Sequence, residues 1–203
     1  MRLTHTVHRL GVSNNRLQPL SNLKLGRDAF SHLTELQLNG TLMTWQAIMG
    51  VVCLMPRLQQ LESGYNRLQY LSLPQNRPEL VVNTLNLDSN QLSNWVETCQ
   101  ALVSFHKYSY HLKLCPLRSS DSCPRLGRLV LSSNSYESIP VPTGNNIPLK
   151  LTHLSLSLTR ISEWSSVDSL NLWCPELESL TLNGTPLMEG ALQRNMESTA
   201  FSL

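Results

Sequence analysis

A repeated spacing of leucines constrains the fold of this chain more than any other feature. The template L-x-x-L-x-L-x-x-N-x-L, with substitutions at single positions, fits seven successive segments. The asparagine position of each copy is held by Asn or Thr, and these register positions are Asn15, Thr41, Asn66, Asn90, Asn134, Thr159 and Thr185. Differences between neighbouring position numbers give steps of 26, 25, 24, 44, 25 and 26 residues. All but one of these steps share one period, which a chance distribution of leucines would not produce.

Such a period is typical of an α/β leucine-rich-repeat solenoid, whose units are roughly 20–29 residues long. The L-x-L part alternates as a half-buried strand does, so we expect successive strands to form a curved parallel sheet on the concave side. The return segments predict short helices or turns on the convex side. Residues 45–54 indicate one such helix, and residues 165–170 indicate the start of another with a serine as N-cap. Adjacent repeats then bury one continuous core.

The register positions indicate a structural ladder along the solenoid. An asparagine amide donates to and accepts from backbone groups of adjacent turns, which burial would otherwise leave unpaired. A threonine hydroxyl does only part of this. Replacing Asn66 or Asn90 by alanine is therefore expected to cost about 1–3 kcal/mol.

The 44-residue step interrupts the array. It leaves room for an insert of about 19 residues near 104–122, either a surface loop or a gene-model artefact. We predict a repeat array of about seven units over residues 1–190 and an unstructured tail over 191–203. Because no polar cap flanks the terminal repeats, the chain is expected to be a fragment of a longer protein.

Composition excludes several classes of function. The net charge is only +2 and no segment concentrates Lys and Arg, which argues against a nucleic-acid partner. No apolar run of about 18 residues occurs, so no membrane span is predicted. The five cysteines are spread along the chain without clustered caps, and the first residues lack an apolar signal core. We therefore expect a reducing, cytoplasmic location.

No pattern of residues indicates catalysis or a cofactor. His153 lies near Ser155 in the sequence, but no placed carboxylate completes a catalytic set. The insert gathers four residues that bind zinc in other proteins, but their spacing fits no zinc template; they are His106, His111, Cys115 and Cys123. We predict a protein that is not an enzyme and has no metal, no cofactor and no catalytic residue.

The strand residues beside the inner leucines should face solvent on the concave side. Ten of them are candidate partner-binding residues: Glu35, Gln37, Asn39, Gln60, Glu62, Thr84, Asn86, Asp88, Arg128 and His153. The middle repeats bring carboxylates to one region, and the later repeats bring Arg128 and His153. This surface suits a protein partner with a complementary field, and the alternative is a solvated face without a single partner.

Three tryptophans also follow the period. Trp45, Trp95 and Trp164 stand four or five residues after a register position. They could form an aromatic ridge for a partner, or each could cover the convex side of the core. Because repeat-phased large apolar residues usually serve the stack, we expect all three to be buried.

Three segments carry a more particular resemblance: LNGTLMTW, RISEWSSVDSLN and LTLNGTPL. With them, about residues 7–188 resemble the repeat region of the tubulin-folding cofactor E family. The resemblance implies that the parent protein binds α-tubulin and acts with other tubulin-folding cofactors. That work is the assembly or disassembly of the α/β-tubulin heterodimer, in the cytoplasm and in association with the cytoskeleton. The flanking glycine-rich and ubiquitin-like domains of that family are not visible in this sequence.

A second interpretation stays open. A cytosolic leucine-rich-repeat adaptor for another protein, of the phosphatase-regulator or ubiquitin-ligase-receptor type, would share the same template. A flanking F-box or a stricter, shorter repeat would support that interpretation, and the sequence shows neither.

Overall fold

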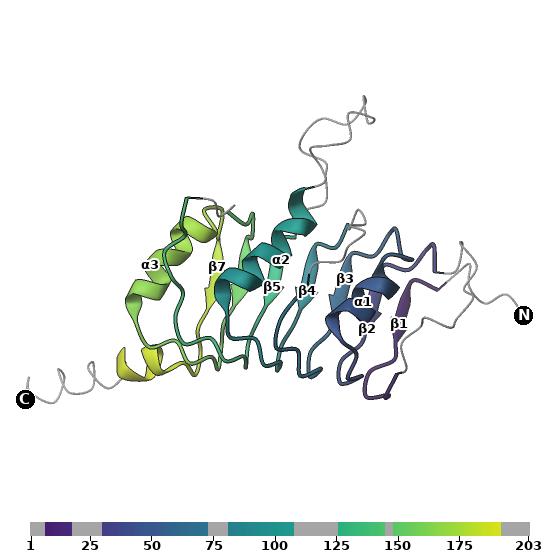
Figure 1. Ribbon diagram of the computed structural model, residues 1–203, viewed down its shortest axis with the longest axis horizontal. Coiled ribbons are helices and arrows are strands. Elements are labelled where there is room, and N and C mark those ends of the chain that lie inside the picture. Colours follow the sequence, from purple (N-terminus) through teal and green to yellow (C-terminus); the bar gives the residue numbers. More distant parts are fainter. Residues whose placement is uncertain (1–6, 18–29, 73–80, 108–125, 145–147, 192–203) are drawn as a thin grey trace, which may run out of the picture.

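The computed structural model describes residues 7–17, 30–72, 81–107, 126–144 and 148–191, with side chains omitted for 103–107. Within these residues, seven short strands form one open, curved parallel sheet in chain order (Figure 1). The predicted α/β leucine-rich-repeat solenoid is therefore confirmed. The strands are β1 (Arg9–Gly11), β2 (Glu35–Gln37), β3 (Gln60–Glu62), β4 (Thr84–Asn86), β5 (Arg128–Val130), β6 (His153–Ser155) and β7 (Ser179–Thr181).

The central leucine of each strand fixes the register. Leu36 lies opposite Leu10 on one side and Leu61 on the other, and the same leucine-to-leucine pairing continues through β7. Strand β4 pairs directly with β5, so Leu85 lies opposite Leu129 across the long step in the sequence. The long step therefore leaves the register of the described strands intact.

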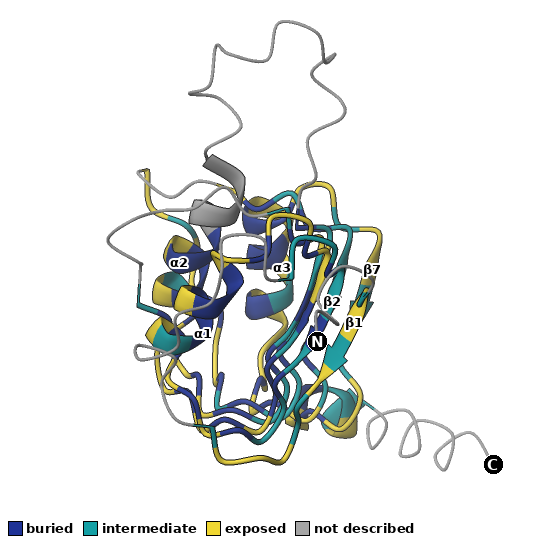
Figure 2. Ribbon diagram, turned by 90° about the vertical axis from the view of Figure 1, so that its right-hand side faces the viewer, coloured by how far each residue is buried: buried dark blue, intermediate teal, exposed yellow. Residues whose placement is uncertain are grey.

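Three helices lie on one side of the sheet, and the other side of the strands is open to solvent (Figure 2). They are α1 (Trp45–Val52), α2 (Trp95–Lys107) and α3 (Trp164–Trp173). The first begins at Thr44, whose hydroxyl accepts from the N–H of Ala47 at 3.3 Å. In the second, the side chain of Asn94 accepts from the N–H of Glu97 at 3.2 Å.

Two boundary predictions need correction. The N-cap of α3 is Glu163, which makes no side-chain cap bond, so the predicted serine cap is wrong. The hydroxyl of Ser166 instead accepts from the N–H of Ile139 at 3.0 Å, which ties the first turn of α3 to the loop after β5. Residues 104–107 continue α2 rather than beginning a loop, and 108–122 lie outside the described residues. Residue 191, the first of the predicted tail, is helical together with 186–190, and residues 192–203 also lie outside the described residues.

Buried leucines and a small aromatic cluster make the core. Trp45 and Trp95 are buried as expected, but Trp164 is 49% exposed, so the prediction for that residue is wrong. Trp173 at the other end of α3 takes the interior position. Its ring meets that of Trp95 edge-on at a centroid distance of 6.4 Å, and Trp95 meets Tyr136 in the same way at 5.8 Å. These contacts join α2, α3 and the segment after β5.

The residue before each register position has a left-handed backbone, and we call these seven residues the turn row. They have φ between 51° and 68°, and they are Asn14, Gly40, Tyr65, Ser89, Ser133, Leu158 and Gly184. In the first six, the backbone N–H donates to a carbonyl of the next repeat with N···O distances of 2.7–3.0 Å. The left-handed turn thus extends the hydrogen-bond ladder of the sheet beyond its strands.

Gly184 should not accept a side chain. A Cβ at this position would lie 2.6 Å from Cδ2 of Leu158, and φ is +68°. We expect Gly184→Ala to lower the free energy of unfolding by about 1–2 kcal/mol, because an L-residue is strained in this region. Urea denaturation followed by circular dichroism measures the change. The matched control is Gly50→Ala in α1, where a Cβ meets nothing within 4 Å. That substitution should stabilise by about 0.5–1 kcal/mol, and equal losses in both variants would contradict the explanation.

Candidate partner-binding face

The open side of the sheet, here called the sheet face, carries the residues that flank each central leucine. Because side chains alternate along a strand, the neighbours of a buried leucine point away from the core. The structure places the ten predicted residues on β2–β6 or two residues beyond a strand end. Gln60 and Arg128 are exposed and the other eight are half-buried. The sheet face is therefore accessible but not deeply recessed.

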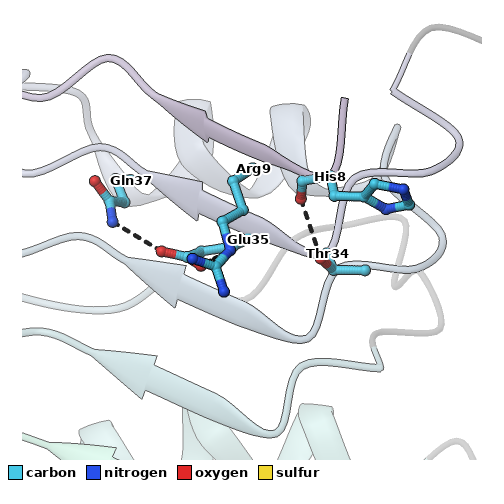
Figure 3. A network of polar contacts seen from close by, with 5 residues as sticks. All are labelled: His8, Arg9, Thr34, Glu35 and Gln37. Atoms are coloured by element: carbon cyan, nitrogen blue, oxygen red, sulfur yellow. Dashed lines mark hydrogen bonds and ion pairs between the residues drawn. The ribbon is translucent and has the colours of Figure 1, made fainter. Parts of the chain in front are cut away.

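The first two strands hold a closed polar network (Figure 3). The Arg9 guanidinium contacts the Glu35 carboxylate at 3.0 Å, and the Gln37 amide donates to the other oxygen of that carboxylate at 2.8 Å. The side chain of Glu35 is only 16% exposed. Of the predicted residues, Glu35 and Gln37 are thus already engaged with each other, and a partner would have to displace those contacts.

Asn39 has a structural role in positioning Glu62. Its amide donates to the Glu62 carboxylate at 3.1 Å, and its oxygen accepts from the N–H of Gly64 at 2.7 Å. On the next strand, the side-chain oxygen of Asn86 accepts from the N–H of Asp88 at 2.8 Å. Neither Glu62 nor Asp88 forms an ion pair within the described residues. Two carboxylates therefore remain uncompensated over β3 and β4.

An arginine and a histidine occupy the sheet face further along the sheet. Arg128 and His153 lie opposite each other in the register of β5 and β6. The Nδ1 atom of His153 lies 3.0 Å from the Thr152 hydroxyl. No residue of β5, β6 or β7 carries a carboxylate. The two remaining predicted residues are uncharged: Gln60 lies opposite Thr84 in the register of β3 and β4. The Thr84 hydroxyl donates to the side-chain oxygen of Asn83. The sheet face thus changes from acidic side chains to basic ones along its length.

The buried asparagines bind successive repeats together. Asn66 accepts from the N–H of Leu42 at 2.7 Å and donates to the carbonyl of Leu38 at 2.9 Å. Asn90 and Asn134 make the same kind of contacts with the repeat before each of them. These amides satisfy backbone groups that the core would otherwise leave unpaired.

The other register positions contribute less to the ladder. The Thr41 hydroxyl contacts the carbonyl of Leu38 and the side chain of Asn66. The hydroxyls of Thr159 and Thr185 each donate to a carbonyl of their own turn, at 2.7 Å and 2.8 Å. Asn15 is exposed, and among the described residues its amide donates only to carbonyls of its own turn. The residues that join one repeat to the next are therefore chiefly the buried asparagines.

Sequence reasoning missed two exposed residues beside the sheet face. Tyr65 and Leu158 belong to the turn row and are 60% and 63% exposed. A signal was present in the sequence, since a large apolar residue stands directly before the register position where other repeats have Gly, Asn or Ser. Left-handed backbone disfavours Tyr and Leu, so their presence there calls for an explanation.

The two buried thiols, Cys99 and Cys174, are poorly suited to chemistry. Burial raises the pKa of Cys174 to about 12. Burial, and then the nearby Cys174 thiol, raise the pKa of Cys99 further still. Both groups therefore stay protonated at neutral pH, where only a thiolate attacks or binds a metal. Within the described residues, no three His, Cys, Asp or Glu side chains gather closely enough to hold a metal ion. Of the four insert residues, only the backbone of His106 is described.

The described helices include none that is long and apolar enough to cross a membrane.

Comparison with known proteins identifies relatives of this chain, although no protein-family model matches it. Tubulin-specific chaperone E of Xenopus laevis is 30% identical over 193 residues, which cover 93% of this chain and 33% of the relative. The Danio rerio protein of that name is 29% identical over 95% of this chain and 33% of its own length. The tubulin-specific chaperone cofactor E-like protein of Rattus norvegicus is 26% identical over 93% of this chain. The chain thus spans about a third of the two chaperone E relatives. The resemblance to tubulin-folding cofactor E is confirmed: over nearly its whole length, this chain is similar to a segment of tubulin-specific chaperone E.

Proposed function

We propose that this chain is a protein-binding scaffold that binds α-tubulin during folding, assembly or disassembly of the α/β-tubulin heterodimer. The observation that carries the proposal is the similarity of 93% of the chain to proteins named for tubulin-specific chaperoning. The open sheet face supports it, because a solenoid presents a long, rigid surface to a partner. We further propose that the chain binds without catalysing a reaction, in the cytoplasm and in association with the cytoskeleton and other tubulin-folding cofactors.

The proposed mechanism is stabilisation by binding. A partner that binds only one conformation of a tubulin subunit raises the population of that conformation by mass action. The continuous backbone ladder from β1 to β7 keeps the sheet face in one shape, so little ordering free energy is lost when the partner docks. Charge on the sheet face then orients the partner and excludes surfaces of the wrong sign.

The direct test is retention of tubulin by the immobilised full chain of 203 residues. Purified α/β-tubulin is passed over the chain, and α-tubulin and β-tubulin are quantified separately after elution. We expect retention of α-tubulin and none of serum albumin, the acidic control protein. A variant lacking 108–122, which leaves α2 whole, shows whether those residues take part. A chain that is folded by circular dichroism yet retains no tubulin would contradict the proposal and favour the cytosolic adaptor.

A further inference from the structure

Two residues of the turn row differ in kind from the others. Five positions carry Gly, Asn or Ser, but Tyr65 and Leu158 place large apolar side chains on left-handed backbone. Gly adopts this conformation without strain and Asn tolerates it, whereas Tyr and Leu are strained in it. Both side chains are also mostly exposed, so burial gains little to offset the strain. Folding alone therefore does not explain these two residues.

Both side chains stand at the same edge of the sheet, the edge at which the strands end. The N–H of Tyr65 donates to the carbonyl of Asp88 at 3.0 Å, and the N–H of Leu158 donates to that of Asn183 at 2.8 Å. They belong to the repeats of β3 and β6, which are separated by two strands. At about 4.8 Å between strands, they lie roughly 14 Å apart along the edge.

The strands alone are too small for a stable complex. Seven strands of three residues cover a flat area of roughly 29 Å by 10 Å, or about 300 Å². A standard interface buries about 800 Å² on each partner. A protein that docks on the sheet face must therefore extend over a neighbouring edge. Each residue of the turn row lies three residues beyond the end of its strand, and the first six continue the backbone ladder to the next repeat.

The charge beside Tyr65 indicates the chemistry of what docks there. Its hydrogen bond to the Asp88 carbonyl places it next to that residue, and Glu62 lies three residues before it. Both carboxylates lack an ion pair in the part of the chain described, including with the nearby Arg67. A cation between two carboxylates and against a tyrosine ring gains both Coulomb and cation–π attraction.

We propose that two exposed side chains of the turn row hold the partner protein. Tyr65 and Leu158 are the apolar anchors, and a Lys or Arg of the partner lies between Glu62 and Asp88 beside the Tyr65 ring. The proposal rests on the proposed function and names the part of the surface that performs it. The partner must then present an apolar strip about 14 Å long, on the strand spacing, with a basic side chain at one end. Tyrosine is among the residue types that dominate interface energetics.

Glycine substitutions separate anchoring from folding. In Tyr65→Gly and Leu158→Gly, the strain of the left-handed backbone is relieved. This gain offsets the loss of the buried part of the side chain. We expect melting temperatures within about 2 °C of the wild type but affinity for α/β-tubulin weaker by about 10-fold in each. Ser133→Gly is the matched control, since it lies in the same row between the two anchors and should bind as the wild type does. Asparagine also tolerates left-handed backbone, so Tyr65→Asn or Leu158→Asn replaces the corresponding glycine variant if that variant fails to fold.

A charge variant tests the basic contact. Glu62→Gln with Asp88→Asn should weaken binding and make the affinity less sensitive to salt, whereas Glu178→Gln, at the opposite edge of the sheet, should change neither. Binding of the glycine variants at wild-type affinity would overturn the anchors and leave the proposed function standing. An unchanged salt dependence would overturn the basic contact. Absence of binding by the wild-type chain would overturn the proposed function and this inference together.

Discussion

Trp173→Ala is expected to lower the free energy of unfolding by about 3–5 kcal/mol, the largest effect anticipated for a core residue of this chain. The indole is 1% exposed, and its Nε1–H donates to the carbonyl of Pro140 at 2.7 Å. Its ring also packs edge-on against Trp95 of α2. Alanine would leave a cavity between two helices and remove the hydrogen bond to the Pro140 carbonyl. Urea denaturation, followed by circular dichroism and tryptophan fluorescence, measures the loss.

The control lies on the same helix. Trp164 is the first residue of α3 and is about half exposed, so Trp164→Ala should change the free energy of unfolding by less than about 1 kcal/mol. The two variants remove the same side chain from the two ends of one element. Equal destabilisation would show that burial does not set the effect, and would contradict the role assigned to Trp173.

These two tryptophans also show where the sequence stops being informative. Trp45, Trp95 and Trp164 each begin a helix, so their common phase after the register positions does report local structure. The spacing after the register positions did not predict which tryptophan is buried. Helix α3 carries an indole at each end, and only that of Trp173 faces the core. Which end turns inward depends on the packing against Trp95, a contact that links residues distant in the chain.

The strands and their register were predictable from the leucine spacing, because a one-residue slip would expose every central leucine. Helix α2 was not predicted, although buried Trp95, Thr98, Cys99 and Leu102 follow helical spacing. The 44-residue step was interpreted as containing an insert, and the helical spacing at its beginning was overlooked. The start of α3 was predicted at Ser165 and Ser166, because serine is a preferred N-cap residue. The helix instead begins after Glu163, whose side chain makes no cap bond.

For the candidate site, the repeat template predicted which side chains lie on the sheet face. It did not predict which of them bond to one another. Glu35 and Asn39 both qualify by position, yet the structure commits each to internal hydrogen bonds. Rotamers and cross-strand distances decide this, and neither follows from spacing. The left-handed backbone of Tyr65 was missed because the propensity of tyrosine argues against it, although other repeats carry Gly, Asn or Ser at the same position.

Asn90→Ala is expected to destabilise the chain by about 3 kcal/mol, at the upper end of the range for a buried polar group. Its side-chain oxygen accepts from the N–H groups of Asn66 and Leu68 at 3.1 Å and 3.0 Å. Its amide donates to the carbonyls of Ser63, Leu87 and Asp88 at 2.9–3.3 Å. Alanine would remove all five bonds and leave the buried N–H groups of Asn66 and Leu68 and the carbonyl of Ser63 without the partner that Asn90 supplies. The carbonyls of Leu87 and Asp88 would keep the bonds that they accept from Asn134 and Tyr65. Three of the five bonds reach the preceding repeat, so the loss should fall mainly on the contact between repeats.

The measurement for Asn90→Ala combines thermal unfolding with amide hydrogen exchange. A loss of about 3 kcal/mol corresponds to a melting temperature lower by about 6–12 °C for a domain of this size. Exchange should accelerate most at the N–H groups of Asn66 and Leu68, which lose their acceptor. Asn15→Ala is the matched control, because Asn15 is exposed and its bonds to the described part of the chain stay within its own turn. Its effect should stay below about 1 kcal/mol, and an equal loss would mean that the asparagine shapes its own turn instead of joining two repeats.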